Sequence, residues 1–261
     1  MNPGPPLPQN TTAVSLAGLN AEPDAPWQGE PKRAISWAAS TGAVGLVIDA
    51  ARAGFRPREL DASARRDLGA ALRRQGLVFS GIDLWVPPEH FTSPANADRA
   101  FDALRGSCEL ARALAPESGR GAVVSVMLPD DQSVQTTAAG IAERAGAHIA
   151  DHSAARFNPD RNEGVHTLRH GLDPAALFAV GMDPIAIAAK HAPSLASARI
   201  SDLGPMGRVA AGTARLDLGA YRVTLGVAGY AGPLVIDLRG LRNQDVAARE
   251  LVERLLAPPF A

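Results

Sequence analysis

Four short apolar runs in the second half of the chain each end on, or just before, a carboxylate. They are residues 147–151 (AHIAD), 168–173 (LRHGLD), 198–202 (ARISD) and 234–237 (LVID). An apolar run that ends in an acid is typical of a buried parallel strand with a polar group at its carboxyl end. In α/β barrels this edge of the strands carries the chemistry. The four runs therefore predict one shared mouth that is lined by carboxylates.

Strand and helix patterns alternate along the whole chain. The predicted strands are residues 12–16, 43–49, 77–84, 122–127, 147–151, 168–172, 198–201 and 234–236. The predicted helices are residues 31–40, 63–75, 96–114, 133–145, 184–191, 218–228 and 244–256. This alternation predicts an α/β protein with a single (β/α)8 TIM barrel over residues 12–261, after a flexible N-terminal tail at 1–11. The polar, turn-rich stretch 157–164 predicts that the fifth helix is reduced to a loop.

The charge balance and the cysteine content narrow the class of partner. With 26 basic and 27 acidic residues the net charge is −1, so we expect no nucleic acid partner. No run reaches the ~18–20 apolar residues of a membrane helix, and we expect no membrane partner. The N-terminus lacks the features of a secretory signal, and Cys108 is the single cysteine. We therefore expect a cytoplasmic protein.

Several motifs in this order resemble those of the xylose-isomerase-like barrels, a superfamily that includes sugar-phosphate isomerases and epimerases. They are residues 171–174 (GLDP) followed by 181–184 (GMDP), 198–202 (ARISD), 212–217 (GTARLD) and 229–237 (GYAGPLVID). In the first half of the chain, residues 27–49 resemble the first helix and second strand of the superfamily in their order and spacing. The resemblance covers most of the chain and rests on the order and spacing of the motifs. It implies a TIM barrel that acts on a small-molecule carbohydrate, and it is compatible with a homo-oligomer.

The resemblance also implies a divalent metal, Mn²⁺, Mg²⁺ or Co²⁺, at the strand ends. Sugar isomerases of this superfamily hold the metal with two Glu, one Asp and one His. Position by position, the first Glu falls at Asp151, the Asp at Asp173, the His at Arg199 and the last Glu at Asp237. Asp151, Asp173 and Asp237 are thus the implied metal ligands. Asp151 and Asp237 are also the implied catalytic acid/base pair, which would move a proton between adjacent carbons.

The chain departs from that pattern in a way that changes the chemistry. Each Glu that becomes Asp retracts its carboxylate by about 1.5 Å. Arg199 is permanently cationic and cannot ligate a metal. Its planar fork suits pairing with carboxylates instead. One hypothesis is therefore that Arg199 occupies the metal position, among Asp151, Asp173 and Asp237, and that no metal binds.

Five residues are candidates for substrate binding. They are Trp85, His90, His152, Arg199 and Arg208. Trp85 and His90 belong to the loop after the third predicted strand, where an indole can stack on a sugar and an imidazole can bind hydroxyls. His152 follows Asp151 directly, so only one of the two faces the barrel centre. Arg208 lies in the loop after the seventh strand, where it could hold a phosphate or carboxylate. Packing of Trp85 and solvation of Arg208 are the structural alternatives.

The sequence is compatible with three classes of function, of which the first two are favoured. The first is a sugar or sugar-phosphate isomerase or epimerase with an altered metal site. The second is a non-catalytic, metal-free barrel that binds a carbohydrate or a protein partner. The third is a lyase or hydrolase that uses the same mouth without a metal. The sequence leaves open whether the barrel is an enzyme.

Overall fold

Eight parallel strands close into one barrel. The computed structural model describes residues 11–116, 121–158 and 168–258. The strands are β1 Thr12–Ser15, β2 Gly45–Asp49, β3 Val78–Asp83, β4 Val123–Val126, β5 His148–Asp151, β6 Leu168–Leu172, β7 Leu195–Ile200 and β10 Leu234–Ile236. They pair in the order β1-β10-β7-β6-β5-β4-β3-β2, and every pair is parallel. The predicted single (β/α)8 barrel is confirmed.

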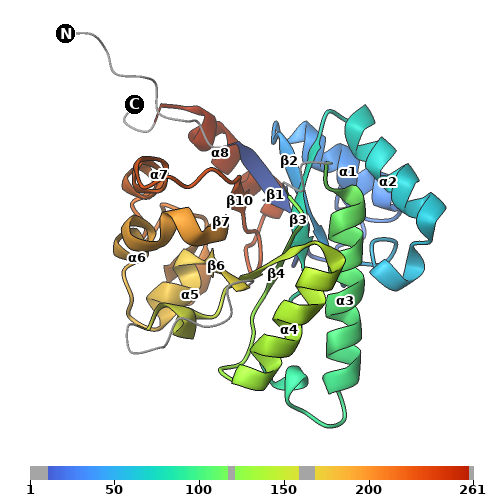
Figure 1. Cartoon of the computed structure of the whole chain (residues 1–261). Helices are drawn as coiled ribbons and strands as arrows, with labels where there is room; N and C mark the ends of the chain where they lie inside the picture. Colours follow the sequence, from blue (N-terminus) through green and yellow to red (C-terminus); the bar gives the residue numbers. More distant parts are fainter. Residues whose placement is uncertain (1–10, 117–120, 159–167, 259–261) are drawn as a thin grey trace, which may run out of the picture.

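Helices surround the strands on all sides, with α1 to α4 over one half of the barrel and α5 to α8 over the other (Figure 1). They are α1 Pro31–Ser40, α2 Ala62–Arg74, α3 Ala97–Leu114, α4 Gln132–Ala145, α5 Pro174–Ala179, α6 Pro184–His191, α7 Leu218–Val227 and α8 Gln244–Leu256. Short 3-10 turns are η1 Pro57–Glu59, η2 Pro88–Phe91, η3 Ala154–Phe157 and η4 Ala192–Ser194. None of the described helices combines the length and apolar composition that crossing a bilayer requires.

The structure differs from the sequence-based expectation around three strands. The sequence patterns do not predict α5, nor the antiparallel hairpin of β8 (Asp202–Gly204) and β9 (Gly207–Val209). Strand β7 begins three residues before the predicted strand. Between β5 and β6, the described residues contain only the turn η3. Residues 159–167, and with them most of the predicted loop at 157–164, lie outside the described part of the chain.

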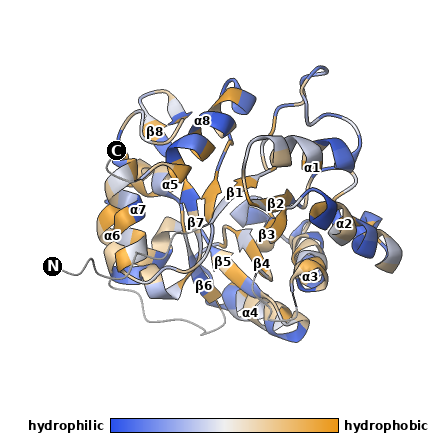
Figure 2. Cartoon of the chain, turned by 90° about the horizontal axis from the view of Figure 1, so that it is seen from above, coloured by the Kyte–Doolittle hydropathy of each residue, from blue (hydrophilic) through white to orange (hydrophobic). Residues whose placement is uncertain are grey.

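The barrel wall separates two layers of side chains, because neighbouring residues of a strand point to opposite sides. Outward-facing strand residues pack against the helices in one large core. They include Val14, Ile48, Ile82, Val124, Ile149, Leu172, Ile200 and Ile236. Seen from above, the apolar strands stand at the centre of the ring of helices (Figure 2). This core fixes the strands against the helices, so the side chains inside the barrel are not needed for that packing.

The inside of the barrel turns from apolar to polar along the strands. A small separate apolar cluster consists of Ala13, Val47 and Val235. Two residues further along the same three strands, the positions on the same face are Ser15, Asp49 and Asp237. The carboxyl ends of the strands therefore open onto a polar mouth.

Asp202 anchors the long connection from β7 to α7. Its carboxylate has no exposed surface. It accepts hydrogen bonds of 2.8–3.1 Å from the backbone N–H groups of Leu203, Gly212, Ala214, Arg215 and Leu216. One side chain thus fixes both ends of the segment that carries the hairpin β8–β9.

We expect Asp202→Ala to lower the free energy of unfolding by about 3–5 kcal/mol, because it leaves several buried N–H groups without an acceptor. Urea unfolding measures the loss. The matched control is Asp217→Ala. Asp217 caps α7 because its exposed carboxylate accepts one hydrogen bond from Ala220 N–H, so a loss of about 1 kcal/mol is expected there. Equal losses in the two variants would contradict the anchoring role.

Candidate functional site

Three acids and three arginines meet at the carboxyl ends of the strands. Asp83 comes from β3, Arg199 from β7, Arg208 from β9, and Asp173, Asp237 and Arg239 from the segments after β6 and β10. Parallel strands end at one edge of the barrel, so residues that lie far apart in the sequence converge here. We call these six residues the mouth network.

Asp83 and Arg199 form the deepest ion pair of the mouth network. Neither side chain has exposed surface. Arg199 donates from Nη1 to Asp83 Oδ2 at 3.0 Å and from Nη2 to Asp83 Oδ1, and Ser15 Oγ donates to Oδ2 at 2.5 Å. This is the bidentate geometry that matches a guanidinium to a carboxylate.

The position of Arg199 corrects the hypothesis that its guanidinium lies among Asp151, Asp173 and Asp237. The register explains why. Arg199 pairs with Val235, so Asp237 lies two residues closer to the mouth than Arg199 does. At its depth, Arg199 reaches across the barrel to Asp83 on β3.

Asp173 and Asp237 are held by two other arginines. Arg208 donates to Asp173 Oδ2 at 2.6 Å and to Asp237 Oδ2 at 3.2 Å. Arg239 donates from Nη2 to Asp173 Oδ2 at 2.9 Å, and from Nε to both oxygens of Asp237 at 2.9 and 3.0 Å. Ser201 Oγ adds a bond of 2.7 Å to Asp173 Oδ1. The two acids and two arginines thus form one closed set of charges.

The arginines keep both carboxyl groups ionised. Burial alone would raise the pKa of Asp173, but Arg208 and Arg239 outweigh it and hold that pKa well below its usual range. The pKa of Asp237 is also lowered, because Arg239 and then Arg208 overcome the effect of burial. A carboxyl that stays ionised in a salt bridge is a poor proton donor at neutral pH.

The residues at this position do not fit a divalent metal. The oxygens of Asp173 and Asp237 already accept hydrogen bonds from two guanidinium groups. A cation about 4 Å from a divalent ion costs several kcal/mol even at an effective dielectric near 20. Within residues 11–116, 121–158 and 168–258, no three His, Cys, Asp or Glu residues are grouped to hold a metal ion.

Asp151, the third acid that the resemblance implies as a ligand, faces away from the mouth network. Asp151 pairs with Val126, whose side chain is in the outer core. Its Oδ1 accepts from the N–H groups of Leu128 at 3.1 Å and Ser153 at 3.0 Å, and Arg156 Nε lies 3.7 Å from Oδ2. The implied acid/base pair of Asp151 and Asp237 is therefore not brought together.

His152 takes the inward position that Asp151 does not. Its Nε2 lies 3.2 Å from Ser125 Oγ, on the inner face of β4. Its ring packs edge-on against Trp85, with 5.3 Å between the centroids. Burial, and then the charge of Arg199, hold the pKa of His152 well below its usual value. The imidazole is therefore neutral at physiological pH.

Trp85 covers the mouth network from one side. The guanidinium carbon of Arg239 lies 3.8 Å from the centre of its ring, and that of Arg199 lies 5.3 Å away. These are cation–π distances, which stabilise an arginine that is partly removed from water. The half-buried indole therefore touches both ion-pair sets.

His90 and Asp49 border the site differently. His90 lies in the turn η2, which packs on α3, and the described contacts do not bring it into the mouth network. Asp49 ends β2, and its Oδ1 accepts from Ala51 N at 2.8 Å. Burial, with a contribution from the charge of Asp83, raises the pKa of Asp49 to about 6. It is thus a carboxyl at this end of the barrel that changes its charge near neutral pH.

Two members of the mouth network, Asp83 and Arg239, are not among the residues expected from the sequence. Asp83 carries the same signal as the acids of the second half, since it stands near the end of the apolar run 77–84 (LVFSGIDL). Arg239 has no comparable signal. Arg239 lies in the turn that follows Asp237, and this turn belongs to none of the predicted strands or helices.

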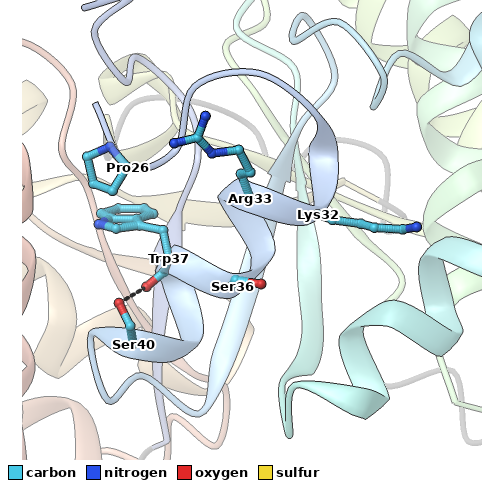
Figure 3. A pocket seen from close by; sticks show the side chains of 6 residues that line it. All are labelled: Pro26, Lys32, Arg33, Ser36, Trp37 and Ser40. Carbon is cyan, nitrogen blue, oxygen red and sulfur yellow. Dashed lines mark hydrogen bonds between the residues drawn. The ribbon is translucent and has the colours of Figure 1, made fainter. Parts of the chain in front are cut away.

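A shallow pocket of about 370 Å³ lies outside the barrel, on the surface of α1. Figure 3 shows its lining residues, which are Pro26, Lys32, Arg33, Ser36, Trp37 and Ser40. Trp37 is fixed by a bond of 2.7 Å from Nε1 to Asp245. The pocket contains none of the residues that the sequence marks as candidates.

No family model and no curated protein sequence matches the chain. Solved structures do match. The xylose isomerase domain protein from Planctomyces limnophilus gives a TM-score of 0.70 at 18% identity, over 96% of this chain and 97% of that one. A xylose isomerase-like TIM barrel protein from Mycobacterium smegmatis in complex with magnesium gives 0.64 at 15% identity, over 97% and 98%. The D-psicose 3-epimerase from Clostridium cellulolyticum H10 with D-tagatose gives 0.66 at 14% identity, over 94% and 99%.

These similarities define the fold of the chain. The chain shares the TIM-barrel fold of these xylose isomerase-like proteins, as the order of the sequence motifs predicts. Identities of 14–18% over nearly whole chains relate the backbones, whereas the function of a barrel is decided by its mouth.

We expect Arg199→Met to lower the free energy of unfolding by about 3–5 kcal/mol, because Asp83 would stay buried without its cation. The double variant Asp83→Leu/Arg199→Met should recover most of that loss, since it removes both charges. Urea unfolding of the two variants measures the difference. As a control, Arg105→Met breaks the exposed pair with Asp102 and should change stability by at most about 1 kcal/mol. A double variant no more stable than Arg199→Met would contradict the account.

The rings of His170, His191 and Phe157 form a second cluster, away from the mouth network. The ring of His170 stacks on Phe157 at 5.1 Å and meets His191 at 5.2 Å. Burial, and then the charges of Arg156 and His191, lower the pKa of His170 to about 4. The fold therefore favours the neutral ring.

His170 should make the protein less stable in mild acid. Its folded pKa lies below the unfolded value of about 6.5, so its contribution is complete above pH 6.5 and is lost as the pH falls towards 4. We expect His170→Phe, which keeps the stacking on Phe157, to lose less stability between pH 7 and pH 5 than the wild type. Urea unfolding at the two pH values measures this. Identical losses in both proteins would show that His170 is not responsible.

Proposed function

We propose that this barrel binds a small, uncharged carbohydrate at its mouth without a divalent metal. The observation that carries the proposal is the pairing of Asp173 and Asp237 with Arg208 and Arg239. At the position where the sequence resemblance implies a metal, the chain supplies its own cations. The arginines neutralise the acids and offer hydrogen-bond donors to hydroxyl groups.

The charge balance favours a neutral ligand over a sugar phosphate. Three arginines face three acids within the mouth network, so no cation is left over there for an incoming anion. Above pH 6, Asp49 adds a further negative charge near the mouth. The side chains of Arg208 and Arg239 remain 24% and 19% exposed, which leaves an edge of each for a ligand.

Two structurally similar proteins support a sugar as the ligand class. One is a D-psicose 3-epimerase with D-tagatose, and another is a D-psicose 3-epimerase in the presence of D-fructose. Both share the barrel of this chain. Their ligands are neutral sugars, as the charge balance favours here.

Isomerase- or epimerase-type turnover is the second candidate function, and Asp49 is the observation that favours it. A carboxyl with a pKa of about 6 can take up and release a proton at neutral pH, as general acid–base chemistry requires. Asp173 and Asp237 lack that property, because the arginines keep them ionised. Turnover would then disappear in Asp49→Asn, while sugar binding through the arginines would persist.

Metal independence can be tested by melting. We expect the melting temperature of the wild type to be unchanged by EDTA or by millimolar MnCl₂. The double variant Arg208→Ala/Arg239→Ala frees two carboxylates, so Mn²⁺ should raise its melting temperature relative to EDTA. A clear rise in the wild type would contradict the proposal and restore a metal site.

Ligand class can be tested by calorimetry with D-tagatose, D-fructose and D-fructose 6-phosphate at pH 7.5. We expect a neutral sugar to bind and the phosphate ester to bind no better. Arg239→Met should weaken sugar binding about tenfold or more, because it removes donors at the mouth. Arg33→Met, in the pocket on α1, is the control and should not change the affinity. Preferential binding of the phosphate ester would contradict the neutral-ligand proposal.

A further inference from the structure

In the part of the chain that the structure describes, three buried polar atoms without a hydrogen-bond partner belong to side chains that pack together, Trp85 and its two neighbours His152 and Arg199. They are Trp85 Nε1, His152 Nδ1 and Arg199 Nε. The ring of His152 and the guanidinium of Arg199 each lie 5.3 Å from the Trp85 ring. His152 is 2% exposed and Arg199 is fully buried. Buried polar atoms in folded proteins almost always have a partner, so three orphans in one place indicate a polar group that joins them.

We propose that Trp85, His152 and Arg199 form a subsite for one hydroxyl group of the sugar, a proposal that rests on the function proposed above. Trp85 Nε1 and Arg199 Nε carry hydrogens and can only donate. The Nδ1 of His152 is an acceptor when its Nε2–H donates to Ser125 Oγ, 3.2 Å away. A hydroxyl accepts two hydrogen bonds and donates one, so it satisfies all three atoms.

Other polar groups fit this arrangement less well. A carbonyl or phosphate oxygen accepts from the two donors but offers no hydrogen to His152 Nδ1. An ammonium group would meet the positive charges of Arg199 and Arg239. Burial, and then the charge of Arg199, hold the pKa of His152 well below its usual value, so its unprotonated ring nitrogen retains a lone pair. The subsite therefore selects a hydroxyl.

Gly171 leaves the space that the imidazole of His152 occupies. A Cβ atom at position 171 would lie 2.4 Å from Cδ2 and 2.5 Å from Nε2 of His152. A side chain there would displace the ring from Ser125 and from Trp85. Gly171 is thus a positioning residue for the subsite. Because Trp85 also stacks on Arg239, the subsite is continuous with the mouth network.

Calorimetry with D-tagatose and its singly deoxygenated analogues tests the subsite. We expect His152→Phe, which keeps the ring against Trp85 but removes Nδ1, to weaken D-tagatose binding about tenfold. One deoxy analogue should bind the wild type correspondingly weakly and should lose nothing more in His152→Phe. The control His170→Phe changes a half-buried histidine outside the mouth and should leave all affinities unchanged. If His152→Phe weakened every analogue by the same factor, no hydroxyl would occupy the subsite and the proposal would be overturned.

A high-resolution crystal structure without sugar separates this proposal from the proposed function. We expect an ordered water within hydrogen-bond distance of Trp85 Nε1, His152 Nδ1 and Arg199 Nε, taking the place of the hydroxyl. If that water is present but neither D-tagatose nor D-fructose binds, the proposed function fails and the polar subsite stands. If the three atoms instead bond to protein groups, the subsite is overturned, whether or not sugar binds. A sugar complex with every hydroxyl elsewhere would overturn the subsite alone.

Discussion

Charge balance inside a closed barrel is the constraint on which this site depends. The strands deliver Asp83, Asp173 and Asp237 to one poorly solvated mouth, where unpaired carboxylates would repel each other and lose their hydration. A divalent metal is one source of compensating charge. Here Arg199, Arg208 and Arg239 provide it from within the chain. A guanidinium also brings directional donors, so the mouth gains a fixed hydrogen-bonding surface together with its neutrality.

The loops around the mouth are built to hold these cations in place. The Asp202 carboxylate accepts hydrogen bonds from backbone N–H groups at both ends of the segment that carries the hairpin and Arg208. Asp173 holds Arg208 and also caps α5 through Ala176 N at 3.4 Å. Trp85 covers Arg239 at 3.8 Å. The same residues therefore stabilise the loops and position the charges, so that changes at the mouth should alter stability and binding together.

The sequence predicts the barrel well because its strands are short apolar runs with a clear helical pattern between them. Strands β6 and β10 have the predicted boundaries, and helices α1, α6 and α8 also agree. The terminal acids identify the carboxyl edge of the barrel without any knowledge of the contacts. The hairpin β8–β9 and the short α5 escape prediction because each is too short to show a periodic pattern.

The partners within the mouth could not be predicted from the sequence. Arg199 and Asp83 are 116 residues apart, and only the closed barrel brings them face to face. Whether Asp151 or His152 faces inward depends on the phase of β5, and a shift of one residue exchanges them. The sequence resemblance favours Asp151 as the functional position, whereas the structure turns His152 towards the mouth.

The proposed function depends on arginine standing in the place of a divalent metal at Asp173 and Asp237. Diffraction from crystals soaked in MnCl₂, recorded at the manganese absorption edge, would show which of the two occupies that place. We expect no anomalous peak between the two carboxylates and clear density there for the guanidinium groups of Arg208 and Arg239. A strong peak coordinated by Asp173 and Asp237, with the two arginines displaced, would contradict it.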